Sequence, residues 1–304
     1  MPGRVFITGG SGFVGSAIIA ELTARGYEVN ALVNHTILEA GKNVRVIKGS
    51  IFDGAALDAG MAGCKSVIHL VGIIMEKPGA GVTFQKVHVE GTRWVLEAAW
   101  RKGVSRIVQM SALGTGPEAV SNYHKTKWQA EELVRQSKLD WTILRPALIH
   151  GPAGEFMKMM AGWARKRKPP FFFMPYFGKG LLGLGGKVLV QPVYVGDVAR
   201  AFVDCLENPK TSKKTYDVVG ADRMTWPEMY GIAAEKIVGK KRPALAIPAW
   251  YAMGLTKILP GGLLPFNQDQ VIMSGMDNVG ESDAFERDFG WKPGGFEGTL
   301  VAPP

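Results

Sequence analysis

The sequence predicts an α/β fold in which a doubly wound parallel sheet carries helices on both faces. Short apolar runs alternate with segments of helical periodicity through the first half of the chain. A glycine-rich turn joins the first apolar run to the first helical segment. After about residue 150 this alternation gives way to sequence rich in Met, Phe, Pro and Gly. For 304 residues we therefore expect a sheet domain over residues 1–150 and a smaller substrate or partner lobe over residues 151–304.

The first expected strand, residues 5–7, runs into three glycines spaced three apart, and residues 16–25 then have helical periodicity. The first glycine permits a tight turn, the second lets backbone amides approach a pyrophosphate, and the third lets the helix pack closely on the strand. An ordinary strand–helix turn is the alternative, because 39 residues of the chain are glycine. The context favours dinucleotide binding. The expected contacts from this turn are Gly9, Gly12, Phe13, Val14 and Gly15.

Further strands and helices follow in alternation. Strands are expected at residues 29–33, 44–47, 67–71, 107–110 and 141–144, and helices at residues 84–101 and 122–137. This order predicts a Rossmann-type doubly wound parallel sheet that binds its ligand at the carboxyl ends of the strands. Residues 187–219 contain a strand, a helix and a strand again. We therefore expect the small C-terminal lobe to be interleaved with the core.

Composition narrows the class of protein. With 46% hydrophobic and 21% charged residues, the chain is expected to be globular. Cys64 and Cys205 form neither a metal-binding spacing nor a secretory disulfide framework, so we expect a reducing compartment and no metal site. The first strand begins near residue 1, and the apolar stretch 244–266 is interrupted by prolines, a lysine and a glycine pair. These features predict a cytoplasmic protein without a signal peptide or a membrane span.

The net charge of +9 is compatible with several partners. A nucleotide phosphate, an acidic protein, an anionic membrane surface and nucleic acid would all suit it. No nucleic-acid-binding motif occurs, so no nucleic-acid partner is expected.

The end of the second expected strand indicates which cofactor is bound. Asn34 and His35 stand where an acid would accept hydrogen bonds from the ribose of NAD, and no acid precedes Glu39. Without that carboxylate a 2′-phosphate is not repelled, so NADP(H) is favoured over NAD(H). Lys42 and Arg45 are candidates to reach the 2′-phosphate, and solvated surface bases are the alternative.

Two more residues are candidates for the cofactor site. Asp53 follows the third expected strand and would either contact the adenine edge or cap the next helix. Leu70, near the end of the fourth expected strand, is expected to line the cofactor.

Tyr123 and Lys127 form the second chemical signal. Four residues apart on an expected helix, they share one face. A neighbouring ammonium would lower the pKa of the phenol and make Tyr123 an acid or base. Lys127 would also hydrogen-bond the nicotinamide ribose. The alternative is an accidental exposed pair.

Together these motifs resemble the extended or atypical short-chain dehydrogenases/reductases, which are NAD-dependent epimerase/dehydratase-like proteins. More narrowly, the chain resembles bacterial relatives of the nucleotide-binding accessory subunit of respiratory complex I. The segments that carry the resemblance are FITGGSGFVGS, IVQMSALG, LRPALIHGP, PVYVGDVA, VHVEGTRWVLEAA, YHKTKWQAEELVRQSKLDWTILRP, IPAWYAMGLTKILP and LPFNQDQVIM.

The resemblance implies a role for Ser111 and two departures from the family pattern. Active members place a Ser or Thr hydroxyl after the fifth strand to bind the substrate oxygen, and here Ser111 stands one position early, before Ala112. His88 occupies a position where many members carry Asn, and it would either hold a water or fill a polar gap.

Three functions are open at this point. An oxidoreductase acting on an apolar carbonyl or quinone-related compound is supported by Tyr123 and Lys127. The alternative is a non-catalytic accessory subunit that holds a cofactor in a complex I-like assembly. A sugar-nucleotide epimerase or dehydratase is third, because no clear site for a nucleotide sugar occurs in the lobe.

The lobe carries a basic cluster beside aromatic residues. Residues 165–168 are all basic, and Phe171, Phe172, Phe173 and Tyr176 follow. A solvated helix end with core aromatics is one interpretation, and peripheral contact with the inner face of a membrane or with a respiratory complex is the other. Residues 181–186 (LLGLGG) are expected to form a flexible apolar loop near the substrate mouth.

Overall fold

The computed structural model describes residues 3–34, 41–185, 187–258, 264 and 266–303. The chain divides into two compact units. Unit 1 contains the described residues up to Pro146 together with Val195–Val218 and Ser282–Lys292. Unit 2 contains Ala147–Tyr194, Val219–Glu281 and the described residues from Pro293 onward. Each unit is described by itself below.

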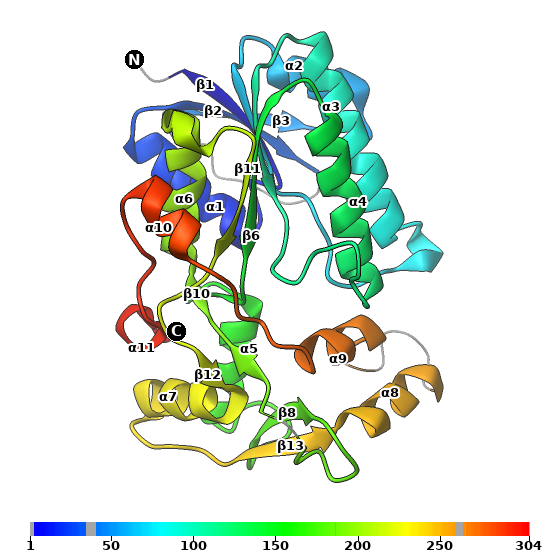
Figure 1. Ribbon diagram of the computed structural model, residues 1–304, viewed down its shortest axis with the longest axis vertical. Coiled ribbons are helices and arrows are strands. Elements are labelled where there is room, and N and C mark those ends of the chain that lie inside the picture. The colour runs from blue at the N-terminus through cyan, green and yellow to red at the C-terminus, as the bar shows by residue number, and fades with distance from the viewer. Residues whose placement is uncertain (1–2, 35–40, 186, 259–263, 265, 304) are drawn as a thin grey trace. The chain divides into compact units, whose positions relative to one another are not determined.

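Unit 1 is built on a parallel sheet. Among the described residues, seven strands pair in the order β11-β6-β5-β4-β1-β2-β3 (Figure 1). Every pairing in this sheet is parallel, which confirms the doubly wound α/β fold. The strands are β1 (Arg4–Thr8), β2 (Glu28–Val33), β3 (Val44–Lys48), β4 (Ser66–His69), β5 (Arg106–Met110), β6 (Asp140–Pro146) and β11 (Lys214–Val218).

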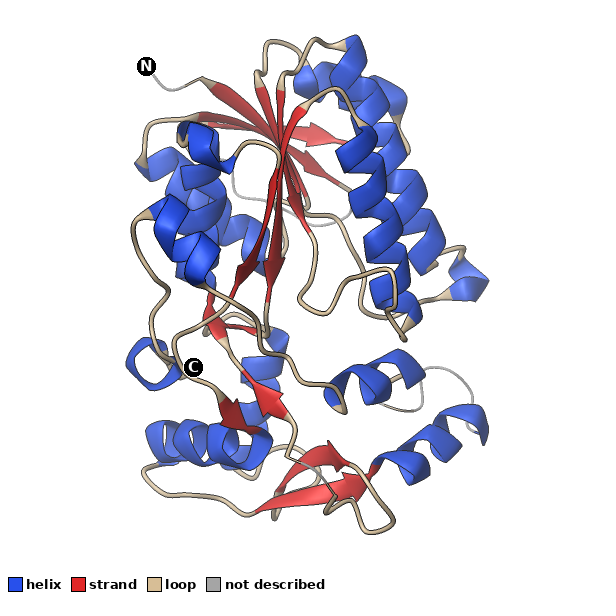
Figure 2. Cartoon of the chain, in the orientation of Figure 1, coloured by secondary structure: helices blue, strands red, loops and turns tan. Residues whose placement is uncertain are grey.

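Helices cover both faces of this sheet (Figure 2). α1 and α6 pack together on one face, whereas α2, α3 and α4 form a layer on the other. The helices of unit 1 are α1 (Phe13–Ala24), α2 (Gly54–Met61), α3 (Gly91–Arg101), α4 (Asn122–Gln136), α6 (Val195–Glu207) and α10 (Asp283–Phe289), with 3₁₀ turns at Pro78–Ala80 and Pro209–Thr211.

One hydrophobic cluster of unit 1 lies between the sheet and the α2–α3–α4 layer. Phe6 and Ile107 from the strands meet Leu57, Val95 and Val134 from the helices, all of them fully buried. The apolar residues of the strands are buried on successive positions because both faces of the sheet are covered.

The helix expected over residues 84–101 is divided in the structure. Gln85–Glu90 has π-helical hydrogen bonding and runs directly into α3. π-helical turns of this kind occur mainly as bulges and often at functional sites. Here the turn carries His88, whose side chain is buried.

Unit 2 consists of short paired strands and helices. Its paired strands are β7 (Ile149–His150) with β10 (Val193–Tyr194), β8 (Met174–Gly178) with β13 (Ala244–Pro248), and β9 (Leu189–Val190) with β12 (Met224–Thr225). Its helices are α5 (Glu155–Ala164), α7 (Trp226–Val238), α8 (Ala249–Ile258), α9 (Gln268–Ser274) and α11 (Phe296–Thr299). Met157, Met160, Met229 and Phe296 form the centre of its core. None of the described helices is both long enough and apolar enough to cross a membrane.

Candidate functional site

The glycine turn after β1 is closed so tightly that side chains are excluded at Gly9 and Gly15. Gly9 has a φ of +74°, and a Cβ there would lie 3.3 Å from the Cβ of Leu70. The amide of Gly12 donates to the carbonyl of Gly9 at 3.1 Å. A Cβ on Gly15 would lie 2.2 Å from that same carbonyl oxygen, so only glycine fits at this position. The structure therefore brings Gly9, Gly15 and Leu70 together at the carboxyl end of β1.

The amino terminus of α1 offers backbone amides to an anion. Gly12 is the N-cap residue, no side chain caps the helix, and no acid lies in its first turn. The first bond within the helix runs from the amide of Ser16 to the carbonyl of Gly12 at 2.9 Å. The amides of Phe13, Val14 and Gly15 therefore have no acceptor inside the helix. With the positive end of the helix dipole, they fit the pyrophosphate of a dinucleotide.

The sheet register shows which bases stand at the carboxyl edge of β2 and β3. Asn34 is exposed directly after β2. Arg45 pairs with Asn30 near the start of β2, and Lys42 precedes β3, so both stand towards the amino ends of the strands rather than at the carboxyl edge. Lys48 pairs with Val33 and is the base at the carboxyl end of β3. The sequence reasoning missed Lys48, although an expected parallel strand over residues 44–47 places the residue that follows it at the carboxyl edge. Residues 35–40, which include His35 and Glu39, lie outside the described part of the chain.

Asp53 is the N-cap residue of α2. Its Oδ1 accepts from the amide of Ala56 at 3.0 Å, as the helix-cap alternative predicted. The side chain is exposed, and its second oxygen is not used by the cap. Contact with the adenine edge stays a prediction.

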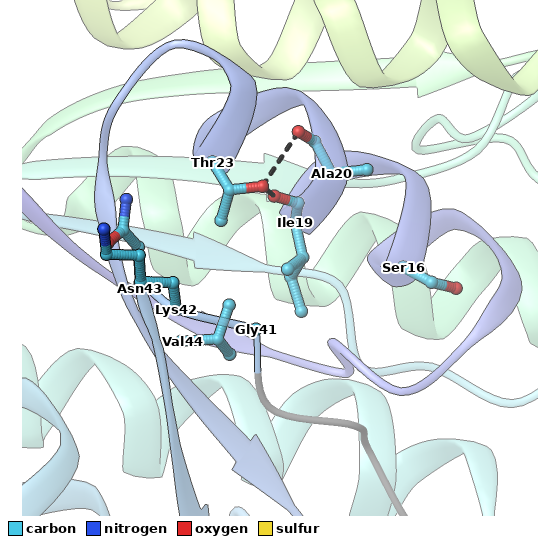
Figure 3. Close-up of a pocket in the computed structure, with 8 residues that line it drawn as sticks. All are labelled: Ser16, Ile19, Ala20, Thr23, Gly41, Lys42, Asn43 and Val44. Atoms are coloured by element: carbon cyan, nitrogen blue, oxygen red, sulfur yellow. Dashed lines mark hydrogen bonds between the residues drawn. The ribbon is translucent and has the colours of Figure 1, made fainter.

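A surface cavity of about 470 Å³ lies beside α1 (Figure 3). It is lined by Ser16, Ile19, Ala20 and Thr23 of α1 and by Gly41, Lys42, Asn43 and Val44. The hydroxyl of Thr23 donates to the carbonyl of Ile19 at 2.9 Å, so its proton is already used within the helix. Neither the helix-terminal amides nor Tyr123 and Lys127 line this cavity. We therefore place the candidate site at the carboxyl ends of the strands, where those groups lie.

Tyr123 and Lys127 lie one turn apart on α4, which Ser121 caps by accepting from the amide of His124. Lys127 is buried, and its Nζ donates to the carbonyl of Met110 at the end of β5 at 3.3 Å. Burial lowers the pKa of this lysine to about 8, and the charge of Glu131 partly offsets that effect.

The prediction that Lys127 lowers the pKa of Tyr123 is wrong for the protein without cofactor. Tyr123 is half-buried, and its ring packs edge-on against Phe84 and His88 with centroids 5.8 and 5.4 Å apart. This burial raises the pKa of the phenol to about 12. Desolvation disfavours the phenolate, while the ammonium of Lys127 is bonded to the Met110 carbonyl. Tyr123 is therefore a neutral phenol at neutral pH.

His88 fills a polar gap, which was one of the two roles expected for it. Its Nδ1 lies 2.9 Å from Oγ1 of Thr126, and its Nε2 lies 3.1 Å from both the amide nitrogen and the carbonyl oxygen of Ile73. The hydroxyl of Thr126 donates to the carbonyl of Asn122 at 2.9 Å, so it accepts from Nδ1, and Nε2 then accepts from the amide of Ile73. Burial, with the charge of Lys127 added, lowers the pKa of His88 to about 2.

A second buried histidine, His69, was not singled out from the sequence. Its Nδ1 lies 2.6 Å from the hydroxyl of Thr8, and its Nε2 lies 3.2 Å from that of Thr92. Thr92 donates its proton to the carbonyl of His88, so it accepts from His69. Burial and the charge of Lys127 lower the pKa of His69 to about 3. Two neutral imidazoles thus stand near the ammonium of Lys127, and no feature of the local sequence indicated this.

Ser111 follows β5 and is buried. Its amide donates to the carbonyl of Leu144 at 2.8 Å, and its hydroxyl lies 3.4 Å from that of Thr115. Thr115 is a polar neighbour that the sequence reasoning missed. At 3.4 Å this contact is weak, so the hydroxyl of Ser111 can exchange it for a better acceptor.

Gly72 keeps the space above Lys127 clear. A Cβ there would lie 2.8 Å from Nζ of Lys127 and 3.4 Å from Nε2 of His88. The glycine after β4 therefore permits the position of the buried ammonium. The sequence reasoning did not identify Gly72, although a glycine shortly after a buried strand often marks a close approach of another group.

The lowered pKa of Lys127 predicts how stability depends on pH. The pKa is about 8 in the folded protein and about 10.4 in an unfolded chain, so between these values the unfolded state binds more protons. The free energy of unfolding contributed by Lys127 therefore rises with pH in this window and is independent of pH below it. Relative to Lys127→Met, we expect the wild type to gain on the order of 2 kcal/mol from pH about 8 to about 10. Urea titrations of both proteins measure this, and a difference that does not change with pH would contradict it.

Comparison with known proteins supports the cofactor class. The NAD(P)H-binding family model matches residues 9–162, about half of the chain. The ceramide reductase of Caulobacter vibrioides is 28% identical over 250 residues, covering 81% of this chain and 74% of that protein. The mitochondrial NADH dehydrogenase [ubiquinone] 1 alpha subcomplex subunit 9 of Arabidopsis thaliana is 28% identical over 242 residues, covering 76% of this chain and 57% of that protein.

Among solved structures, the UDP-glucose 4-epimerase of Thermotoga maritima superposes with a TM-score of 0.72. It is 20% identical, and the match covers 95% of this chain and 93% of that one, so it shows the fold alone. The residues that the family model matches include the glycine turn, Tyr123 and Lys127. The resemblance to extended short-chain dehydrogenases/reductases is confirmed, and the chain belongs to the NAD(P)H-binding family.

Proposed function

We propose that this protein is an NADPH-dependent reductase of an apolar carbonyl compound, including quinone-related ones. The observation that carries the proposal is the placement of Tyr123 and Lys127. The two side chains lie one turn apart on α4, and the buried ammonium is anchored to the carbonyl of Met110 beside Ser111. An accidental surface pair would not be buried and fixed in this way.

The residues that would hold the cofactor span the carboxyl edge of the sheet. The amides of Phe13, Val14 and Gly15 would bind the pyrophosphate. Lys127 would bind the nicotinamide ribose. Among the described residues, Asn34 follows β2 directly and no carboxylate stands beside it. Asn34 and Lys48, on the neighbouring strand, would therefore accept a 2′-phosphate. This combination favours NADP(H) over NAD(H).

Tyr123 is the candidate proton donor for reduction of a carbonyl. With a pKa of about 12 the phenol carries its proton at neutral pH. When bound, the reduced nicotinamide supplies a hydride to the carbonyl carbon. Tyr123 would give its proton to the carbonyl oxygen and recover one from solvent.

Lys127 and Ser111 would support this proton transfer. At neutral pH most Lys127 is protonated, and the ammonium would stabilise the phenolate that forms as the proton leaves. The hydroxyl of Ser111 would leave its weak contact with Thr115 and donate to the substrate oxygen.

Turnover of reduced cofactor tests the proposal. We expect oxidation of NADPH with long-chain ketones, aldehydes or quinones, and at least about tenfold lower kcat/KM with NADH, since one charged contact is lost. Mass spectrometry of the purified protein identifies any nucleotide that it retains. Cofactor binding by calorimetry without turnover on the whole panel would overturn the reductase assignment.

One observation favours a second function. The Arabidopsis relative is named as a subunit of NADH dehydrogenase and is matched over 76% of this chain. A non-catalytic subunit that holds the nucleotide to stabilise a partner interface is therefore the alternative. It predicts cofactor binding with no turnover. The likeness to the solved epimerase structure is one of fold alone and adds no support for a sugar-nucleotide substrate.

A further inference from the structure

In two segments of unit 2, every charged residue is Lys or Arg. Residues 156–194 contain seven Lys and Arg and no acid, and residues 236–268 contain five and no acid. These segments supply β8, β13 and α8, which pack against one another in unit 2 (Figure 1). The part of unit 2 that they build therefore carries one sign of charge.

A short hairpin with three exposed leucines follows β8. Lys179 and Gly185 pair across it, and the amide of Gly185 donates to the carbonyl of Lys179 at 2.7 Å. Leu181, Leu182 and Leu184 are each between 71% and 78% exposed. The expected flexible loop is thus a hydrogen-bonded turn over the described residues, and Gly186 lies outside them.

Glycine holds the hairpin against the sheet. Gly183 has a φ of +73°, and a Cβ there would lie 3.1 Å from the Cβ of Ala246 on β13. A Cβ on Gly178 would lie 1.8 Å from the carbonyl oxygen of Gly183. Because these close contacts fix the backbone, the leucines stay exposed instead of folding back onto unit 2.

Two aromatic residues of α8 extend the leucine tip. The indole of Trp250 donates to the carbonyl of Leu181 at 3.0 Å, which places the ring beside the hairpin. The ring of Tyr251 lies next to it, with centroids 6.0 Å apart. Trp250 and Tyr251 are 59% and 50% exposed. We name the five side chains Leu181, Leu182, Leu184, Trp250 and Tyr251 the leucine–tryptophan patch.

We propose that the leucine–tryptophan patch inserts into the surface of an anionic phospholipid bilayer. Leucines would enter the acyl boundary, while Trp and Tyr would lie at the headgroup level, where their rings are favoured. Lys179 in the hairpin and Lys257 on α8, both exposed, would face lipid phosphates. The protein would lie on the membrane and not span it.

Size and charge favour a bilayer over a protein partner. A stable protein interface takes about 20–30 residues a side, whereas the patch has five apolar side chains. A bilayer binds so small a patch when electrostatic attraction adds to apolar burial. The two acid-free segments supply that attraction.

The patch differs from the membrane contact expected from the sequence. In the basic cluster at residues 165–168, Arg165 bonds the carbonyl of Pro303 at 2.6 Å. Phe172 is 75% exposed with Lys166 5.8 Å above its ring, but Phe173 and Tyr176 are partly buried. The basic cluster adds charge in our proposal, and the leucine hairpin provides the insertion.

Co-sedimentation with vesicles tests the proposal. We expect the wild type to pellet with phosphatidylcholine–phosphatidylglycerol vesicles and to do so far less with phosphatidylcholine alone. The triple variant Leu181→Ser, Leu182→Ser, Leu184→Ser should need at least about tenfold more lipid for half binding, because three leucines lose their burial. Its thermal unfolding should match that of the wild type, since the leucines are exposed. Wild type left in the supernatant at low salt, or a triple variant that pellets equally, would overturn the proposal.

Quenching by brominated lipid gives a second readout. Bromine on acyl chains quenches tryptophan that enters the bilayer. We expect Trp250→Phe to remove most of this quenching and Trp100→Phe, a matched control at a 73% exposed residue of α3, to leave it unchanged. Equal quenching in both variants would contradict insertion of the patch. Light scattering that shows a dimer in the wild type and a monomer in the triple variant, without vesicle binding, would assign the patch to a second copy of the chain instead.

Discussion

Replacing Tyr123 by phenylalanine should lower kcat about 10²- to 10⁴-fold, the usual contribution of a general acid. The substitution removes the one hydroxyl that we place as proton donor and keeps the ring that packs against Phe84 and His88. Affinity for NADPH should change little, because the cofactor contacts are assigned to α1 and Lys127. Steady-state turnover together with calorimetry separates the two effects.

A matched control for this prediction is Tyr27→Phe. Burial also raises the pKa of Tyr27 to about 12, but its hydroxyl bonds Glu207, outside the candidate site. We expect this variant to lose a little stability and to keep its kcat. A Tyr123→Phe protein with the turnover of the wild type would exclude the proton-transfer mechanism.

The substitution Gly12→Val should weaken NADPH binding about a hundredfold or more while the protein stays folded. Gly12 has φ −79° and ψ 172°, which any residue adopts, and a Cβ there would meet the carbonyl of Gly9 at 3.3 Å, a contact that a small shift relieves. The larger side chain would stand over the amides of Phe13 and Val14. Losing two charge-assisted hydrogen bonds to the pyrophosphate accounts for the size of the effect.

Gly15→Ala should behave differently and serves as the contrast. Its Cβ would lie 2.2 Å from the carbonyl oxygen of Gly9, so the turn itself must open and the apo protein should unfold at a lower temperature. Gly12→Val should leave that temperature nearly unchanged. Undiminished NADPH affinity in a folded Gly12→Val protein would remove the pyrophosphate from this helix terminus.

The fold and the two chemical signals could be predicted from local pattern. The glycine spacing predicted the turn, in which the close contact of Gly15 with the carbonyl of Gly9 excludes a side chain, and the alternation of apolar and helical segments predicted the parallel sheet. Tyr123 and Lys127 share a face because a four-residue spacing on a helix requires it. These features depend on residues close together in the sequence.

The tertiary structure decided what surrounds those residues. The register between β2 and β3 set Lys48 beside Val33 at the end of β2, because only the folded sheet fixes which residues of the two strands pair. The chain by itself determined that Tyr123 and Lys127 are neighbours. Only packing decided that Lys127 is buried among His69, His88 and Gly72 and that the phenol has a raised pKa, because desolvation comes from groups that lie far away along the chain.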